Sequence, residues 1–317
     1  MLKLSASQSR SWANGQFCWG TLLKTILISV AVIITLMLAT GIGLFLYSPA
    51  LLVDSIDRAA SRTDMAKIAD GVGFDDKGNR LDIWSSAATG KAGAARPVLV
   101  FFYGGGWANG TRTEYSYAAR PFVEAGYIVV LPDYRKVPQV RFPGFVEDSA
   151  AAVKWVQDNI AKYGGDPDRV SVAGHSAGAY NALMLALDPQ YLGDRPVTSA
   201  ISLAGAADFY PFTSKRAIDA MSSYAKPEAT QPISFVRANA PPILLIHGTA
   251  DTVVRIRNSN SLFAKQKAVG GDISLLALQG ASHNDLVLAL GTLFRGRHPV
   301  VADSVRFLNA ANKKPAE

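Results

Sequence analysis

Residues 170–180 read V-S-V-A-G-H-S-A-G-A-Y, a pattern that few folds accommodate. Residues 170–173 form a short apolar run typical of a buried strand, and residues 179–187 have a helical pattern. Between them, the pattern G-x-S-x-G predicts a sharp strand-to-helix turn that exposes the Oγ of Ser176 on a strained backbone. The stretch therefore predicts Ser176 as a nucleophile, with the N–H of Ala177 directed at any negative charge forming beside it.

From residue 97 onward, apolar runs that predict strands alternate with patterns that predict helices. The predicted strands are 98–103, 127–131, 170–173, 200–203, 243–247 and 273–278, preceded by a hairpin of 66–74 and 81–84 and a loop at 85–96. The predicted helices are 114–125, 145–163, 179–187, 214–225, 258–269, 282–290 and 299–310. This alternation implies an α/β fold in which helices wrap a mostly parallel sheet.

The N-terminal part contains an uncharged apolar run at residues 26–47, long enough to cross a bilayer as a helix. A cleaved signal peptide is the alternative, but the run exceeds the usual length of its apolar region. Three positive residues precede the first acidic residue, Asp54, and favour a cytoplasmic N-terminus. We therefore predict a basic cytoplasmic segment (1–25), a transmembrane signal anchor (26–47), a juxtamembrane linker (48–65) and an external catalytic domain (66–317). In a bacterium, that domain would be periplasmic, or secreted if the anchor were cleaved.

Charge and cysteine content exclude several classes of function. The net charge is +7, but no basic stripe with interleaved aromatic residues is present, which argues against a nucleic-acid partner. Cys18 is the only cysteine, so one chain can form neither an internal disulfide nor a metal site of several thiolates. No metal or cofactor is implied, and the sequence leaves the oligomeric state open.

A serine nucleophile needs a base, and the chain has only four histidines: His175, His247, His283 and His298. His283 follows the last predicted strand, at the sheet edge where ligands gather in open α/β sheets, and is the predicted base. His247 ends a strand and is interpreted as a packed structural group. His175, inside the elbow, is expected to point away from the site, and His298 lies in a polar turn.

The acid that orients His283 is predicted to be Asp251, which follows the penultimate strand. A carboxylate there can accept the Nδ1–H of His283 and stabilise the imidazolium. Asp208, after the strand that ends at residue 203, is the alternative. Asp285 is too close in sequence to His283 and fits a helix-cap role better.

The glycine triplet at residues 104–106 follows a predicted buried strand and can bring backbone N–H groups close to a substrate oxygen. It is predicted to form an oxyanion hole together with the N–H of Ala177. Tyr103 and Trp107 are expected to shape the substrate pocket or to brace this loop. Phe209 is a further candidate for the pocket wall.

Five segments together resemble the α/β-hydrolase superfamily, in its esterase branch related to hormone-sensitive lipase. They are Y-G-G-G-W (103–107), D-Y-R (133–135), G-G-D-P-D-R-V-S-V-A-G-H-S-A-G (164–178), H-G-T-A-D-T-V-V (247–254) and S-H-N-D-L (282–286). The G-G-G-W and S-H-N-D-L forms are most similar to a subgroup of feruloyl-esterase-like and prenylcysteine-methylesterase-like enzymes. The likeness covers residues 97–310.

The resemblance implies an α/β-hydrolase fold with an eight-stranded sheet, a small-molecule ester substrate and no cofactor. It implies Ser176 as nucleophile, Asp251 as acid and His283 as base, with oxyanion donors at Gly105, Gly106 and Ala177. The family usually has histidine where this chain has Tyr103, so the oxyanion loop is expected to be braced differently. Residues 208–240 are short for a lid, which implies a minimal cap and an open site.

These observations predict a membrane-anchored serine hydrolase that cleaves carboxylic esters. An amidase or arylformamidase uses the same machinery on a C–N bond, and no residue in the sequence separates it from an esterase. A non-catalytic binding protein on a hydrolase scaffold is the alternative from another class. A membrane-bound scaffold is supported by the anchor alone.

Overall fold

The computed structural model describes residues 19–61, 63–86 and 94–313. The chain divides into two compact units, with the boundary between Leu52 and Val53. In the first unit, helix α1 (Trp19–Tyr47) contains the segment Leu23–Gly43, which is long and apolar enough to cross a membrane and is not buried. The helix starts before the predicted residue 26 because one lysine, at position 24, does not interrupt a helix. It ends before Pro49, which begins helix α2 (Pro49–Ala60).

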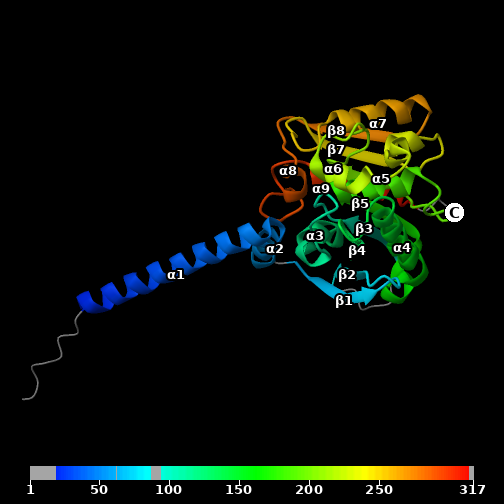
Figure 1. The fold of residues 1–317 in the computed structure, drawn as a ribbon. Coiled ribbons are helices and arrows are strands. Elements are labelled where there is room, and N and C mark those ends of the chain that lie inside the picture. The colour runs from blue at the N-terminus through cyan, green and yellow to red at the C-terminus, as the bar shows by residue number, and fades with distance from the viewer. Residues whose placement is uncertain (1–18, 62, 87–93, 314–317) are drawn as a thin grey trace, which may run out of the picture. The chain divides into compact units, whose positions relative to one another are not determined.

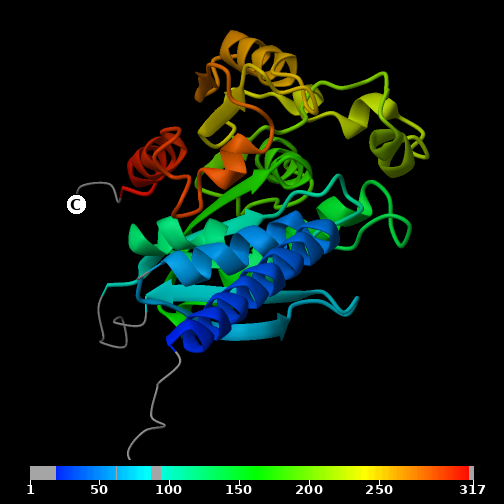
Figure 2. The ribbon, with the colours of Figure 1, turned by 90° about the vertical axis from the view of Figure 1, so that its left-hand side faces the viewer.

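The second unit is built on one mixed sheet of eight strands in the order β1-β2-β4-β3-β5-β6-β7-β8. The strands are β1 (Met65–Gly73), β2 (Arg80–Ser86), β3 (Arg96–Phe102), β4 (Ile128–Pro132), β5 (Gly165–His175), β6 (Ala200–Leu203), β7 (Ile243–Gly248) and β8 (Ile273–Leu278). The β1–β2 and β2–β4 pairs are antiparallel, and the other five are parallel. Figure 2 shows the antiparallel pair at the edge of the sheet opposite β7 and β8. The predicted mostly parallel eight-stranded sheet is confirmed.

The central strands β3, β4, β6 and β7 are buried along almost their whole length. This matches their near-continuous apolar sequences, because a strand covered on both faces does not alternate. The sequence placed the start of β5 too late, at residue 170, because its first residues are polar. β2 likewise runs through Ser85 and Ser86, which were predicted as loop.

Helices flank the sheet, as Figure 1 shows. The α-helices are α3 (Ser116–Glu124), α4 (Gly144–Asn159), α5 (Ala177–Leu187), α6 (Lys215–Met221), α7 (Arg257–Ala268), α8 (Asp285–Leu288) and α9 (Val300–Ala311). The short 3-10 helices are η2 (Arg112–Glu114), η3 (Ile160–Tyr163), η4 (Pro227–Thr230) and η5 (Pro232–Phe235). Helix α3 contacts α9, and α4 contacts α5. The predicted helices 114–125, 214–225 and 282–290 are shorter in the structure, as α3, α6 and α8.

Two buried carboxylates hold residues 53–60 of α2 within the second unit. Asp54 accepts hydrogen bonds from the Oγ of Ser116 (2.5 Å) and the N–H of Tyr117 (2.8 Å), both on α3. Asp57 pairs with the buried Arg120, at 2.6 Å from its Nε. The compact unit begins at Val53, and it includes residues 54 and 57 of the predicted linker, which are bonded to α3.

Replacing Asp57 with alanine is expected to lower the free energy of unfolding of the second unit by about 3–5 kcal/mol, because the charge of Arg120 stays buried without its partner. The double variant Asp57→Ala/Arg120→Leu is expected to lose less, since both charges are gone. Urea denaturation of the full chain in detergent, followed by tryptophan fluorescence, measures both values. A double variant less stable than Asp57→Ala alone would contradict the interpretation.

Candidate active site

Ser176 lies at the junction of β5 and α5, with φ 54° and ψ −117°. Residues other than glycine rarely adopt this backbone conformation, and such strain persists only where surrounding contacts fix the backbone. Here the N–H of Ser176 donates to the carbonyl of Leu203 (2.9 Å) on the neighbouring strand. On the other side of the turn, a β-carbon on Gly178 would lie 2.1 Å from the carbonyl oxygen of Phe102. Only glycine therefore lets α5 start this close to β3.

The three side chains singled out as nucleophile, base and acid form one continuous chain of hydrogen bonds. The Nε2 of His283 lies 2.9 Å from the Oγ of Ser176, and its Nδ1 lies 2.7 Å from Oδ2 of Asp251. Ser176 follows β5, Asp251 follows β7 and His283 follows β8, so parallel strands bring all three to one edge of the sheet. Among the described residues, no hydrogen bond or ion pair links the alternative acid, Asp208, to His283; the backbone N–H of Asp208 donates to Oδ1 of Asn258 instead.

Asp251 is held as a carboxylate by several donors. The N–H groups of Val253 and Val254 each donate to Oδ1 at 2.9 Å. Burial alone would raise the pKa of Asp251, but hydrogen bonds from His247 and His283 and the charge of His283 hold that pKa well below its usual range. At neutral pH, Asp251 is therefore ionised and can stabilise a positive charge on His283.

His247 is fully buried, as predicted for a packed structural group. Its Nδ1 lies 2.7 Å from the Oγ of Ser259, and its Nε2 lies 2.7 Å from the carbonyl of Val254. The same Nε2 is 3.3 Å from Oδ2 of Asp251, a contact that sequence reasoning missed. Residues 247 and 251 flank one tight turn after β7, and this four-residue spacing could have predicted the contact between their side chains.

The position of His175 corrects the expectation that it points away from the site. Its ring centroid is 4.8 Å from that of His283, and its Nε2 is 3.0 Å from the carbonyl oxygen of His283. Burial, with the neighbouring His283 as the second cause, lowers the pKa of His175 to about 3. A neutral His175 therefore donates its Nε2–H to the backbone of His283 and helps to fix the turn that carries the predicted base.

Replacing His175 with asparagine is expected to reduce the decrease in the free energy of unfolding that occurs as the pH falls below 7. An unfolded histidine titrates at about 6.5. The unfolded chain therefore binds one proton more than the folded chain between pH 6.5 and 3, so stability falls as the pH drops through this window. From pH 7 to 5 this side chain accounts for about 2 kcal/mol. The low pKa of Asp251 acts only below about pH 4.

Urea denaturation of the wild-type chain and His175→Asn at pH 7 and pH 5 measures this difference. Asparagine keeps an N–H donor but does not titrate, so the variant separates protonation from loss of the hydrogen bond. An equal drop in stability for both chains would contradict the assignment.

The glycine loop after β3 follows a path that side chains would obstruct. Gly105 has a φ of 131°, and a β-carbon on it would lie 2.2 Å from the carbonyl oxygen of Asn109. Its own carbonyl accepts the N–H groups of Ala108 (3.2 Å) and Asn109 (3.1 Å), which closes the loop. In the part of the chain that the structure describes, the N–H groups of Gly105, Gly106 and Ala177 have no acceptor.

Two of the three predicted pocket residues brace this loop from the interior. Tyr103 is 1% exposed, and its hydroxyl donates to Oδ1 of Asp133 (3.1 Å), so it does not line an open pocket. Trp107 is 5% exposed and donates from Nε1 to Oδ1 of Asn181 (3.3 Å). Phe209 is half-buried, with its ring centroid 6.2 Å from that of Trp107.

Asp285 differs from the helix-cap role predicted for it. Asn284 is the N-cap residue of α8, and Asp285 lies in the first turn. Its carboxylate instead accepts the N–H (2.7 Å) and the Oγ–H (2.6 Å) of Ser282. Asp285 therefore closes the turn that holds His283.

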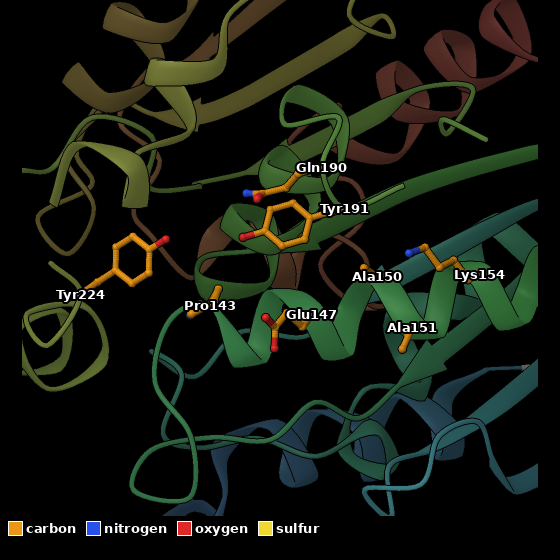
Figure 3. Close-up of a pocket in the computed structure, with 8 residues that line it drawn as sticks. All are labelled: Pro143, Glu147, Ala150, Ala151, Lys154, Gln190, Tyr191 and Tyr224. Carbon is orange, nitrogen blue, oxygen red and sulfur yellow. The ribbon is translucent and has the colours of Figure 1, made fainter. Parts of the chain in front are cut away.

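A cavity of about 300 Å³ lies apart from the predicted site residues. Figure 3 shows it between α4, the turn after α5 and the segment after α6. Its lining comprises Pro143, Glu147, Ala150, Ala151, Lys154, Gln190, Tyr191 and Tyr224. Within the described ranges, no group of three or more His, Cys, Asp or Glu side chains is arranged to hold a metal ion.

Named relatives are similar to part of this sequence. Esterase LipC of Mycobacterium tuberculosis is 32% identical over 66% of this chain and 57% of its own length. Isoprenylcysteine alpha-carbonyl methylesterase ICME of Arabidopsis thaliana is 28% identical over 73% of this chain and 60% of its own. The chain thus spans little more than half the length of these curated relatives.

Solved structures share the fold. EstE1, a thermostable carboxylesterase from a metagenomic library, matches with a TM-score of 0.70 at 20% identity, over 84% of this chain and 96% of its own. A truncated carbohydrate esterase from gut microbiota matches with a TM-score of 0.64 at 20% identity, over 80% and 99%. The BD-FAE family model matches residues 81–266, which is more than half of the sequence. With that match and this fold, the chain belongs to the BD-FAE family of α/β-hydrolases.

Proposed function

We propose that this chain is a serine hydrolase that cleaves carboxylic esters through an acyl-enzyme intermediate. The observation that carries the proposal is the hydrogen-bonded chain from the Oγ of Ser176 through His283 to Asp251 (2.9 and 2.7 Å). A serine activated by a histidine, itself oriented by a carboxylate, is the arrangement that nucleophilic acyl transfer requires. The names of the esterase relatives support the same reaction.

Each of the three residues has one task. Ser176 attacks the ester carbonyl while His283 takes its proton at Nε2, and Asp251 stabilises the resulting imidazolium. Collapse of the tetrahedral intermediate releases the alcohol, which receives that proton from His283. Water, deprotonated by the same nitrogen, then attacks the acyl-enzyme and frees Ser176.

The negative oxygen of each tetrahedral intermediate is assigned to the N–H groups of Gly105, Gly106 and Ala177. These donors have no protein acceptor among the described residues, which supports the assignment. Ala177 is the first residue of α5, where backbone N–H groups point outward. A fixed donor of this kind stabilises the transition state by roughly 3–4 kcal/mol.

Hydrolysis of p-nitrophenyl esters, acetate through decanoate, by the full chain in detergent tests the proposal. We expect ester cleavage and stoichiometric inhibition by a fluorophosphonate. A folded chain that cleaves aryl formamides but no ester would replace the esterase assignment with a formamidase. A chain that neither cleaves nor labels would contradict the hydrolase proposal and support a binding protein.

We also propose that α1 is an uncleaved anchor with its N-terminal end in the cytoplasm and the hydrolase unit outside. The apolar segment Leu23–Gly43 and the positive residues before Asp54 support this orientation.

Cys18, the only cysteine, reports the topology directly because it precedes the apolar segment. In intact cells, a membrane-impermeant maleimide is expected to label Cys18 only after permeabilisation. Absence of Cys18 from the mature chain would show that the segment is a cleaved signal peptide. Labelling in intact cells would show the opposite orientation.

A further inference from the structure

We propose that Arg216 selects esters that carry a second, anionic group, with a carboxylate as the preferred class. This inference rests on the proposed function and adds a substrate class to it. Arg216 lies on α6, in the short cap segment, and neither the sequence patterns nor the three-residue hydrogen-bonded chain involves it.

The first observation is that the glycine loop connects Ser176 to Arg216. At one end of the loop, a β-carbon on Gly104 would lie 3.4 Å from the β-carbon of Ser176. At the other end, a β-carbon on Gly106 would lie 2.5 Å from Cδ of Arg216 and 3.0 Å from its Nη1. Because Gly104 and Gly106 are two residues apart, their α-carbons are separated by at most about 7 Å. The guanidinium group thus lies beside the loop assigned to the oxyanion.

The second observation is that this guanidinium group is available. Among the described residues, the side chain of Arg216 forms no hydrogen bond or ion pair, and Arg216 is exposed. The neighbouring cation, Lys215, is different because its Nζ lies 2.7 Å from Oδ2 of Asp219. A guanidinium group presents donors in a planar fork that matches a carboxylate with two parallel hydrogen bonds.

The third observation is that the backbone that carries Arg216 is fixed. The Oγ of Ser214 caps α6 by accepting the N–H of Ala217 (3.2 Å). The carbonyl of Ala220 accepts the N–H of Phe142 (2.9 Å), and the carbonyl of Asp219 accepts the Nε of Arg141 (2.8 Å). Arg216 therefore extends over the loop from a helix tied to another part of the unit.

The charged group of the substrate can belong to either half of the ester. A carboxylate on the acyl half stays in the site in the acyl-enzyme, whereas one on the alcohol half leaves in the first step. Both present the same charge to Arg216 before Ser176 attacks. The experiment therefore uses one anionic ester of each kind, each paired with a neutral analogue in which an amide replaces the carboxylate.

The alcohol-half pair is 4-acetoxybenzoate and 4-acetoxybenzamide, and the acyl-half pair is monoethyl adipate and the ethyl ester of adipic acid monoamide. kcat/KM is measured with the full chain in uncharged detergent. For Arg216→Gln, we expect kcat/KM to fall at least about tenfold on at least one of the two anionic esters. On both neutral esters, we expect kcat/KM to change less than about twofold. Lys215→Gln removes the same charge from the adjacent position and is expected to leave all four values unchanged.

Salt provides a second readout, which a purely structural role would not change. For the wild-type chain, added NaCl is expected to lower kcat/KM on the anionic ester that is sensitive to Arg216→Gln. Salt screens the attraction, because the Debye length falls from about 10 Å at 0.1 M to about 3 Å at 1 M. Arg216→Gln is expected to lose this dependence.

An equal loss on anionic and neutral esters, or no loss on either, would overturn the assignment of Arg216. The proposed function fails in a different way, namely if the wild-type chain cleaves neither neutral ester. Neutral-ester activity thus also reports that the variant is folded.

Discussion

Ser176→Ala is expected to lower kcat for p-nitrophenyl ester hydrolysis by about 10⁴-fold or more. The variant loses the attacking oxygen, and its residual rate comes only from binding and the oxyanion donors. Because the methyl side chain fits the space of the hydroxymethyl group, we expect the free energy of unfolding to change by less than about 1 kcal/mol. Initial rates with active-site titration by a fluorophosphonate measure the effect.

A matched control is Ser234→Ala, which removes an exposed serine that is bonded to the carbonyl of Glu228. It should retain full activity and full labelling. A Ser176→Ala chain that keeps a tenth of the wild-type rate, or still reacts with the fluorophosphonate, would show that another residue is the nucleophile.

Asp251→Asn is expected to lower kcat by about 10⁴-fold, comparable to the loss from Ser176→Ala. Asparagine keeps the shape of the side chain and an oxygen that can accept the N–H groups of Val253 and Val254. It removes the charge that stabilises the imidazolium. If its amide nitrogen faces Nδ1 of His283, it also places the histidine proton on Nε2, where the base must be free.

The control is Asp208→Asn, which changes the alternative acid and is expected to alter kcat less than about twofold. The double variant Ser176→Ala/Asp251→Asn is expected to be no slower than Ser176→Ala alone, because residues that act as one unit are not additive. If Asp208→Asn were the more damaging change, the assignment of the acid would be wrong.

Strands and turns were predictable from the sequence because they depend on local patterns. The apolar runs at β6, β7 and β8 were placed within one residue of the strand ends. The hydrogen-bonded chain of Ser176, Asp251 and His283 was assembled from one rule, namely that parallel strands bring their carboxyl ends to one edge.

Features that depend on a distant partner were not predictable. Residue 57 falls in the predicted linker, and the buried ion pair of Asp57 with Arg120, on another helix, is not visible in that local pattern. His175 bonds to a carbonyl 108 residues away. Tyr103 and Trp107 were candidates for pocket walls, but their burial depends on partners distant in sequence. Tyr103 stacks on Tyr134, and Trp107 contacts Phe145 of α4 and Tyr180 of α5. A periodic sequence pattern indicates which face of a helix or strand is apolar, but it does not indicate which residues cover that face.

The position of β8 in the sheet has a consequence for how activity is lost. β8 is the last strand in the order and, among the described strands, pairs with β7 alone, whereas β5, which precedes Ser176, lies in the interior of the sheet. The turn that carries His283 begins where β8 ends. Strands at an edge open locally at a lower free-energy cost than central strands. Opening of β8 would therefore separate His283, the proposed base, from Ser176, the proposed nucleophile, while the central strands stay paired. On mild heating, we expect loss of activity through opening of this edge before the core melts.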